Sequence, residues 1–188
     1  LIYKLNKIAL EFYHYVLTKH PAGKKAMAYL TEQRKMDTRI IETFNLGFSP
    51  KEGDALSNYL INKKKQKKED LLEAGLASYS GDFFRNRVMF PLFDHRGNVV
   101  GFSGRAIEEP YNGGKYINTR ETLVYHKGSM FFGLNTAKDE IKKLDKAIIV
   151  EGELDVISCF SGGVKNAIAV KGTALTENQV ALIARFTN

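Results

Sequence analysis

An acidic segment near the end of the chain has the residue types and spacing that can hold a divalent metal ion. The apolar residues 147–150 are typical of a strand buried on both faces of a sheet, and they lead directly into Glu151, with Asp155 shortly after. Carboxylates at the carboxyl end of such a strand suit Mg²⁺, which is usually held by one or two carboxylates together with water and substrate phosphates. We therefore interpret Glu151 and Asp155 as metal ligands.

The same segment has a second interpretation. Acidic side chains in the first turn of a helix are stabilised by the helix dipole, and Gly152 would let the chain turn sharply from a strand into such a helix. This alternative stays open for Glu151 and Asp155, and we favour it for Glu153.

Polar residues earlier in the chain form a second candidate site. Cations spread along predicted strands and glycine-rich loops resemble phosphate contacts, for which arginine supplies two parallel donors and lysine a point charge. The candidates are Arg85, Arg87, Arg105, Lys115, Asn118 and Lys127. A lone surface cation is more commonly a solubilising residue or part of an ion pair. For Asn118, a contact to phosphate or sugar and a role in a turn both stay open.

Composition limits the classes of protein to which the chain can belong. The 188 residues carry a formal net charge of +7, which favours a polyanionic partner. The single cysteine, Cys159, cannot form an internal disulfide, so we expect a reducing cytoplasm. No apolar run approaches the roughly 20 residues of a membrane span. The chain begins at Leu1, and we expect it to be a fragment of a longer protein.

The lysine run at residues 63–68 also has two interpretations. It is either a nucleic-acid contact or a solvated helix end and loop. We favour the second, because no aromatic residue is interleaved with the lysines to stack on a base.

Helical periodicity dominates residues 1–80, which we predict to form a helical layer. The first helix carries an apolar stripe and ends before Pro21. Further helices are predicted at residues 22–34, 38–44 and 69–74, the last of them ended by Gly75, with a turn or a short extended piece at residues 45–50. We identify no internal repeat.

Residues 81–133 are predicted to be rich in sheet, with a hairpin that turns at residues 95–98. From residue 134 the pattern alternates: a helix capped by Asn135, the strand at 147–150, a helix at 155–161, a second buried strand at 166–170, and a last helix for which Thr176 and Gln179 form a capping box. This order predicts a parallel βαβα unit. The predicted fold class is therefore α+β in the first part and α/β in the second.

Five motifs in one order make the chain similar to a known family. They lie at residues 84–91, 101–105, 115–119, 126–128 and 150–156. In these motifs the chain closely resembles the RNA polymerase core of bacterial DnaG-type primases. The resemblance implies an N-terminal subdomain at residues 1–133 and the first part of a Toprim subdomain at residues 134–188.

The resemblance also implies roles for the candidate residues. Glu151 and Asp155 would hold Mg²⁺ or Mn²⁺ in the Toprim part, and Arg87, Arg105, Lys115 and Lys127 would guide template or bind nucleotide phosphates. The family's Asp-x-Asp is missing downstream, so we expect the fragment alone to be inactive. The four histidines have no cysteine partners at zinc spacing, so we expect no zinc site.

The implied reaction is template-directed synthesis of short RNA primers on single-stranded DNA. Its substrates would be ribonucleoside triphosphates and its product an RNA–DNA hybrid, and a replicative helicase would bind through a domain absent from this chain. Two alternatives stay open. The chain could belong to another Toprim protein, such as a phage-type primase or a nuclease, or it could be a non-catalytic module that binds single-stranded DNA.

Overall fold

The computed structural model describes residues 1–109, 114–172 and 174–187, which fold into two compact units. The first unit comprises Leu1–Pro91 and Val99–Tyr125, and the second comprises Leu92–Asn98 and His126–Asn188. Residues 126–133 thus lie in the second unit, whereas we placed them in the N-terminal subdomain from the sequence. A subdomain boundary after residue 133 stays a prediction.

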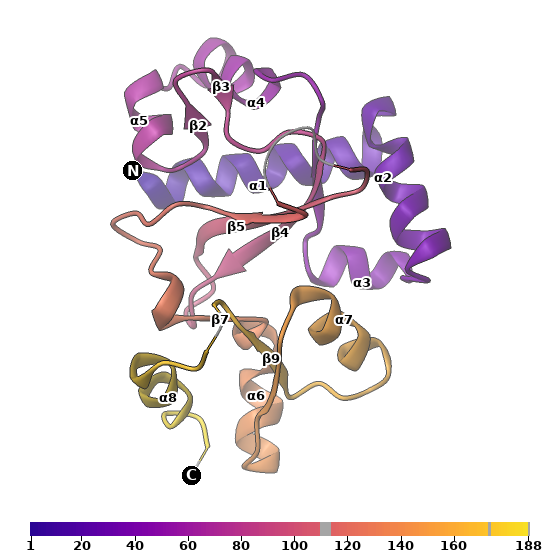
Figure 1. The fold of residues 1–188 in the computed structure, drawn as a ribbon, viewed down its shortest axis with the longest axis vertical. Coiled ribbons are helices and arrows are strands. Elements are labelled where there is room, and N and C mark those ends of the chain that lie inside the picture. The colour runs from indigo at the N-terminus through magenta and orange to yellow at the C-terminus, as the bar shows by residue number, and fades with distance from the viewer. Residues whose placement is uncertain (110–113, 173, 188) are drawn as a thin grey trace. The chain divides into compact units, whose positions relative to one another are not determined.

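Helix α1 (Ile2–Lys19) packs in the first unit on β1 (Gly47–Ser49) and β5 (Val99–Ala106) (Figure 1). The predicted stripe is buried at Leu5, Ala9, Val16 and Leu17, and Tyr13 is buried with them. The helix and β1 meet closely, because a Cβ on Gly47 would lie 2.6 Å from Cβ of Tyr13. Only glycine therefore permits this approach. The helix ends before Pro21, as predicted.

Four strands form the main sheet of the first unit, in the order β1, β4 (Arg87–Phe93), β5 and β6 (Tyr116–Asn118). Ser49 pairs with Arg87 in the antiparallel β1–β4 ladder, and Arg105 pairs with Tyr116 in the antiparallel β5–β6 ladder. The predicted hairpin is confirmed, since β4 and β5 are neighbours and the Asp94 N–H donates to the Asn98 carbonyl at 2.9 Å across the turn.

Two successive segments of the first unit repeat one local structure. In the first copy, α2 (Lys24–Ala28), a π-helical turn (Tyr29–Gln33), α3 (Thr38–Thr43) and β1 follow one another. In the second copy the same order runs through α4 (Ala55–Asn58), a π-helical turn (Tyr59–Lys63), α5 (Lys68–Glu73) and β2 (Ala77–Ser78). From the π-helical turn onward, each element begins thirty residues after its counterpart.

Backbone hydrogen bonds agree between the two copies. The Met36 N–H donates to the Leu30 carbonyl at 3.0 Å, and the Gln66 N–H donates to the Leu60 carbonyl at 3.0 Å. Lys35 and Lys65 both have φ of 55°. Our expectation that the chain has no internal repeat was therefore wrong. The repeat was not visible in the sequence, because the copies share backbone conformation and a few buried positions rather than extended sequence identity.

Short elements complete the first unit. A 3₁₀ turn (Pro21–Gly23) follows α1, and β2 pairs antiparallel with β3 (Gly81–Asp82). The predicted helical layer at residues 1–80 thus also contains β1 and β2. Gly75 ends the α5 segment with φ of 68°, as predicted.

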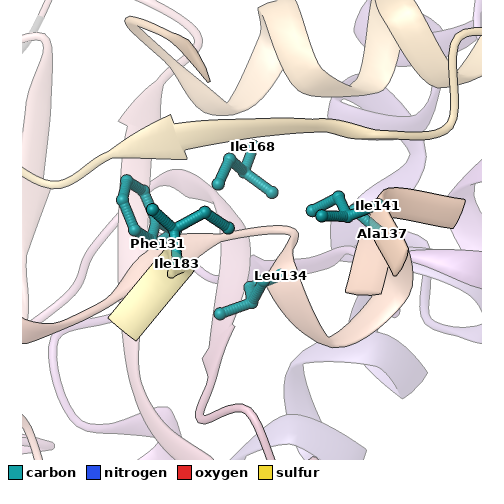
Figure 2. Packing of buried hydrophobic residues seen from close by; sticks show 6 residues of the cluster. All are labelled: Phe131, Leu134, Ala137, Ile141, Ile168 and Ile183. Carbon is teal, nitrogen blue, oxygen red and sulfur yellow. The ribbon is translucent and has the colours of Figure 1, made fainter. Parts of the chain in front are cut away.

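The second unit contains the predicted βαβα order. Its sheet runs β7 (Phe131–Phe132), β9 (Ala167–Val170), β8 (Ile148–Val150), and β8 and β9 are parallel. The helices are α6 (Leu134–Leu144), α7 (Glu153–Ser161) and α8 (Glu177–Ile183). Figure 2 shows the apolar side chains that hold the sheet against α6 and α8: Phe131, Leu134, Ala137, Ile141, Ile168 and Ile183.

Three local predictions can be compared with this unit. The capping box is confirmed, since the Gln179 N–H donates to Thr176 Oγ1 and the Thr176 N–H donates to Gln179 Oε1, both at 3.1 Å. Asn135 does not cap α6, which begins after Gly133 instead. The prediction that β8 is buried on both faces was wrong: Ile148 and Ile149 are 38% and 43% exposed, because β8 is an edge strand in the described part of the sheet.

None of the helices in the described ranges combines the length and the apolar character that a membrane-crossing helix needs.

Candidate metal site and nucleic-acid interface

Glu151 is the first residue after β8 and its side chain is exposed. Val150 lies beside Ala169 in the parallel ladder, so Glu151 follows the strand at the edge where β9 also ends. Within the described ranges its carboxylate accepts no hydrogen bond and forms no ion pair. An exposed carboxylate at the carboxyl edge of a parallel pair is accessible to a ligand, in agreement with the predicted position.

Asp155 is also exposed, but one of its oxygens is engaged. Asp155 Oδ2 accepts the Gly152 N–H at 3.1 Å at the start of α7. This contact is the helix-capping role that the sequence left open for the residue. Gly152 itself has an extended backbone with φ of −140°, which any residue adopts. The sharp turn that we attributed to glycine is therefore not required there.

Glu153 differs most from its predicted environment. We expected an ordinary acid of the first helical turn, whereas Glu153 is buried and Glu153 Oε1 accepts Lys171 Nζ in an ion pair. Both side chains are only 6% exposed. Lys171 directly follows β9 and Glu153 is the first residue of α7, so the pair joins the end of β9 to the start of α7, two residues after Glu151. Sequence reasoning missed Lys171, although a lysine directly after a buried apolar strand signals a charge that needs a partner.

The donor chemistry of this edge fits a hard divalent cation. Glu151 supplies a free carboxylate and Asp155 a second oxygen, which is the kind of partial ligand set to which Mg²⁺ adds waters and phosphate oxygens. Within the described ranges, no group of three or more His, Cys, Asp or Glu side chains could hold a metal. These residues therefore fit part of a magnesium site rather than a complete protein cage.

Arg87, a predicted phosphate contact, is buried at the start of β4 with 4% of its surface exposed. Arg87 Nη1 donates to the carbonyls of Gly104 at 3.3 Å and Lys115 at 3.2 Å, so the guanidinium ties β5 to the residue that precedes β6. Burial lowers the pKa of this guanidinium from its usual value. The group stays charged, because arginine is not deprotonated in proteins.

Arg105 is buried as well, with 5% of its surface exposed. Its guanidinium lies over the ring of Tyr29 at 4.8 Å and the ring of Tyr116 at 5.6 Å, and Nε donates to the Tyr116 hydroxyl at 3.0 Å. Aromatic faces and a hydroxyl thus take the place of a carboxylate around this cation.

Lys115 directly precedes β6, and Asn118 is the last residue of that strand. The Lys115 side chain is exposed, while its carbonyl accepts the Arg87 guanidinium and the Ala106 N–H. Asn118 is half-buried, and its Oδ1 is buried without a hydrogen-bond partner among the described residues. Such an acceptor is unusual in a native protein, and because this oxygen is buried it is not itself accessible to a ligand.

The last two predicted contacts differ in environment. Lys127 is exposed on a 3₁₀ turn (Lys127–Ser129) of the second unit, which Thr176 holds by donating its hydroxyl to the Gly128 carbonyl at 2.5 Å. Arg85 is exposed in the first unit but is committed locally, since Nη2 donates to the Ser80 carbonyl at 2.8 Å and Nε to the Asp82 carbonyl at 3.1 Å. Its contacts favour a role in holding the β2–β3 turn.

Comparison with family models assigns both parts of the chain. Residues 12–138 match the DNA primase catalytic core, N-terminal domain, and residues 145–188 match the Toprim domain.

Individual relatives agree with the family models. A DNA primase of Synechococcus elongatus is 39% identical over 99% of this chain and 27% of its own length. The RNA polymerase domain of the Mycobacterium tuberculosis primase DnaG superposes with a TM-score of 0.91 at 34% identity, over 100% of this chain and 61% of that one. A DnaG primase catalytic domain bound to single-stranded DNA superposes with a TM-score of 0.86 at 32% identity, over 100% of this chain and 58% of that one. The chain thus spans less than a third of the curated relative.

Proposed function

Because this chain belongs to the DNA primase catalytic-core family, we propose that it forms the metal- and template-binding part of an enzyme that makes RNA primers. In this proposal the whole protein joins ribonucleoside triphosphates along single-stranded DNA, leaves an RNA–DNA hybrid, and works in the cytoplasm beside a replicative helicase. The observation that carries the proposal is the exposed carboxylate of Glu151 at the edge where β8 and β9 end.

We propose that Glu151 is the main protein ligand for Mg²⁺ or Mn²⁺. Asp155 would contribute the oxygen that does not cap α7, while its other oxygen fixes the start of that helix. When bound, the metal would polarise phosphate oxygens and stabilise the charge that develops during nucleotidyl transfer. The ligands of this chain would hold it together with waters and substrate phosphates, since two carboxylates leave most of its octahedral positions open.

The cationic residues divide into two proposed roles. Lys115 and Lys127 have exposed side chains and would contact phosphates of template or nucleotide directly. Arg87 and Arg105 are buried and would position this surface, because Arg87 binds the Lys115 carbonyl and Arg105 stacks on Tyr116. Their direct contact with phosphate stays a prediction. We propose that the half-buried Asn118 contacts a phosphate or sugar of the bound nucleotide or template by donating its amide N–H.

The substitution Glu151→Gln in the full-length protein tests the metal role. We expect primer synthesis on single-stranded DNA to be abolished and Mn²⁺ affinity, measured by calorimetry, to fall at least tenfold, while DNA affinity stays nearly unchanged. Glu140→Gln is the matched control, since Glu140 carries the same charge on α6 of the same unit and pairs only with Lys143 in the described part. Undiminished synthesis by Glu151→Gln would refute the proposed role. Cleavage of the template in place of extension would favour the nuclease alternative.

A further inference from the structure

One turn of the first unit carries a dense run of exposed positive charge. Residues 63–68, here called the lysine turn, carry five lysines, all of them exposed: Lys63, Lys64, Lys65, Lys67 and Lys68. None of the five forms an ion pair within the described ranges. By contrast, two arginines that we selected as phosphate contacts, Arg87 and Arg105, are buried. A dense run of exposed lysines in this unit thus lies outside the family motifs.

The lysine turn is fixed by the backbone of the second repeat copy. The Lys64 N–H donates to the Tyr59 carbonyl at 3.2 Å, and the Gln66 N–H donates to the Leu60 carbonyl at 3.0 Å. Lys64 Nζ also lies over the Tyr59 ring at 5.4 Å. The lysines are therefore held on a folded surface in a defined arrangement, unlike a basic tail, whose charges are spread over many conformations.

The equivalent turn of the first copy shows that this backbone does not require lysines. Residues 33–38 adopt the same conformation, yet they include Gln33, Met36 and Asp37 in place of Lys63, Gln66 and Lys67. There Asp37 pairs with Arg39, so the local charges are partly neutralised. The first copy retains only two cations at these positions, Arg34 and Lys35, so the excess of positive charge is a property of the second copy.

The lysines also work against local stability. Asp37 caps α3 by accepting the Arg39 N–H at 2.7 Å, whereas its counterpart Lys67 makes no side-chain cap for α5. A cation beside the first turn of a helix is disfavoured by the helix dipole, and neighbouring lysines repel one another. Glu69 and Asp70 in the first turn of α5 interact favourably with the helix dipole, but the missing cap and the repulsion between the lysines remain. Residues that break such local rules point to a functional constraint.

From the sequence we favoured a solvated helix end and loop for residues 63–68; from the structure we propose instead that the lysine turn binds the phosphodiester backbone of nucleic acid, as a contact additional to Lys115 and Lys127. This inference rests on the proposed DNA binding and names a further surface for that partner. Ammonium groups contact phosphates as point charges. Lys64 Nζ covers a face of the Tyr59 ring, so that face is not open for a base to stack on it. We therefore expect the contact to be independent of base sequence. Its chemistry serves single-stranded and duplex DNA alike.

A matched pair of double variants tests the proposal in the full-length protein. K64Q/K65Q and R34Q/K35Q remove the same charge from equivalent turns, and both Lys64 and Arg34 lie over a tyrosine of the preceding π-helical turn. Affinity for labelled oligothymidylate, and separately for a labelled duplex, is measured by fluorescence anisotropy over a series of salt concentrations. For the single strand, we expect K64Q/K65Q to flatten the slope of log K against log salt by roughly 1.4 and to weaken binding more than tenfold at 0.1 M salt. R34Q/K35Q should leave both quantities close to wild type.

Equal losses in the two double variants would overturn the inference, since they would report overall charge only. If K64Q/K65Q binds DNA as tightly as the wild-type protein does, this inference is overturned and the proposed function stays intact. If the wild-type protein itself does not bind DNA, both are overturned. Loss of binding to phosphatidylserine vesicles with unchanged DNA binding would assign the turn to a membrane instead.

Lys67→Asp separates binding from stability. The substitution places at the start of α5 the same capping residue that Asp37 provides for α3, so we expect the melting temperature to rise. It also removes a positive charge from the lysine turn, so we expect DNA affinity to fall. If the lysine turn serves only solubility, the melting temperature will rise and the DNA affinity will not change.

Discussion

The two units bury positive charge in different ways. In the first unit, Arg105 contacts two tyrosine rings and Arg87 donates to backbone carbonyls, and neither guanidinium forms an ion pair with a carboxylate of residues 1–109, 114–172 or 174–187. In the second unit, buried Lys171 is paired with Glu153. The difference follows from the chemistry of the cations, because a guanidinium is weakly hydrated and planar, whereas an ammonium is compact and strongly hydrated. A buried lysine therefore needs an anion where an arginine can use π faces and carbonyls.

The largest expected effect comes from breaking the ion pair of the second unit. Glu153→Gln leaves the Lys171 ammonium buried without a counter-charge, and we expect the free energy of unfolding to fall by about 3 to 5 kcal/mol. Urea denaturation measures it. The double variant E153M/K171M should recover most of this loss, because an apolar pair of similar volume needs no desolvated charges. A loss below about 1 kcal/mol for Glu153→Gln would show that the pair is solvated in solution.

Arg105→Lys sharpens the same comparison in the first unit. The substituted ammonium would be buried without a carboxylate and would lose the planar stack on Tyr29 and Tyr116, so we expect a loss of about 2 to 4 kcal/mol in unfolding free energy. Lys115→Arg is the control, because Lys115 is exposed and the change should stay within about 0.5 kcal/mol. Equal stability of Arg105→Lys and wild type would contradict the proposed difference between the two cations.

Gly104→Ala tests the space that the buried Arg87 needs. A Cβ at this position would lie 2.7 Å from Phe84 Cδ1 and 3.0 Å from Arg87 Cδ, so packing must shift at a cost of about 1 to 3 kcal/mol in unfolding free energy. Gly162→Ala is the control, because its Cβ would meet only ordinary contacts of 3.5 Å and its φ of −80° suits alanine. Thermal denaturation of both variants decides whether the arginine site is close-packed.

Asp82 extends the comparison to a buried anion and predicts a pH effect. Its carboxylate accepts the N–H groups of Leu56 and Ser57, both at 2.8 Å, yet burial raises its pKa above the usual value. A carboxyl group with a raised pKa in the folded state binds protons there more readily, so its contribution to stability is present below about pH 4 and is lost as pH rises through the folded pKa. We therefore expect the unfolding free energy of wild type, relative to that of Asp82→Asn, to fall over this window. Parallel curves would contradict the raised pKa.

Sequence reasoning located the elements better than their environments. The βαβα order, the β4–β5 hairpin and the capping box at Thr176 were predicted correctly, because periodicity, turn residues and caps act over a few neighbouring residues. The 30-residue repeat escaped prediction, since its copies agree in backbone hydrogen bonds while their exposed residues differ.

The sequence by itself determined the family, the order of the elements and the place of Glu151 at the end of a strand, all of which depend on local patterns and motif order. Only the tertiary structure decided that Arg87 and Arg105 are buried, that Glu153 pairs with Lys171, and that β8 lies at the edge of the sheet formed by the described strands. The physical reason is that burial and charge pairing depend on residues far apart in the chain. The sequence specifies which side chains are charged, but packing determines whether water, an aromatic ring or a counter-ion surrounds each charge.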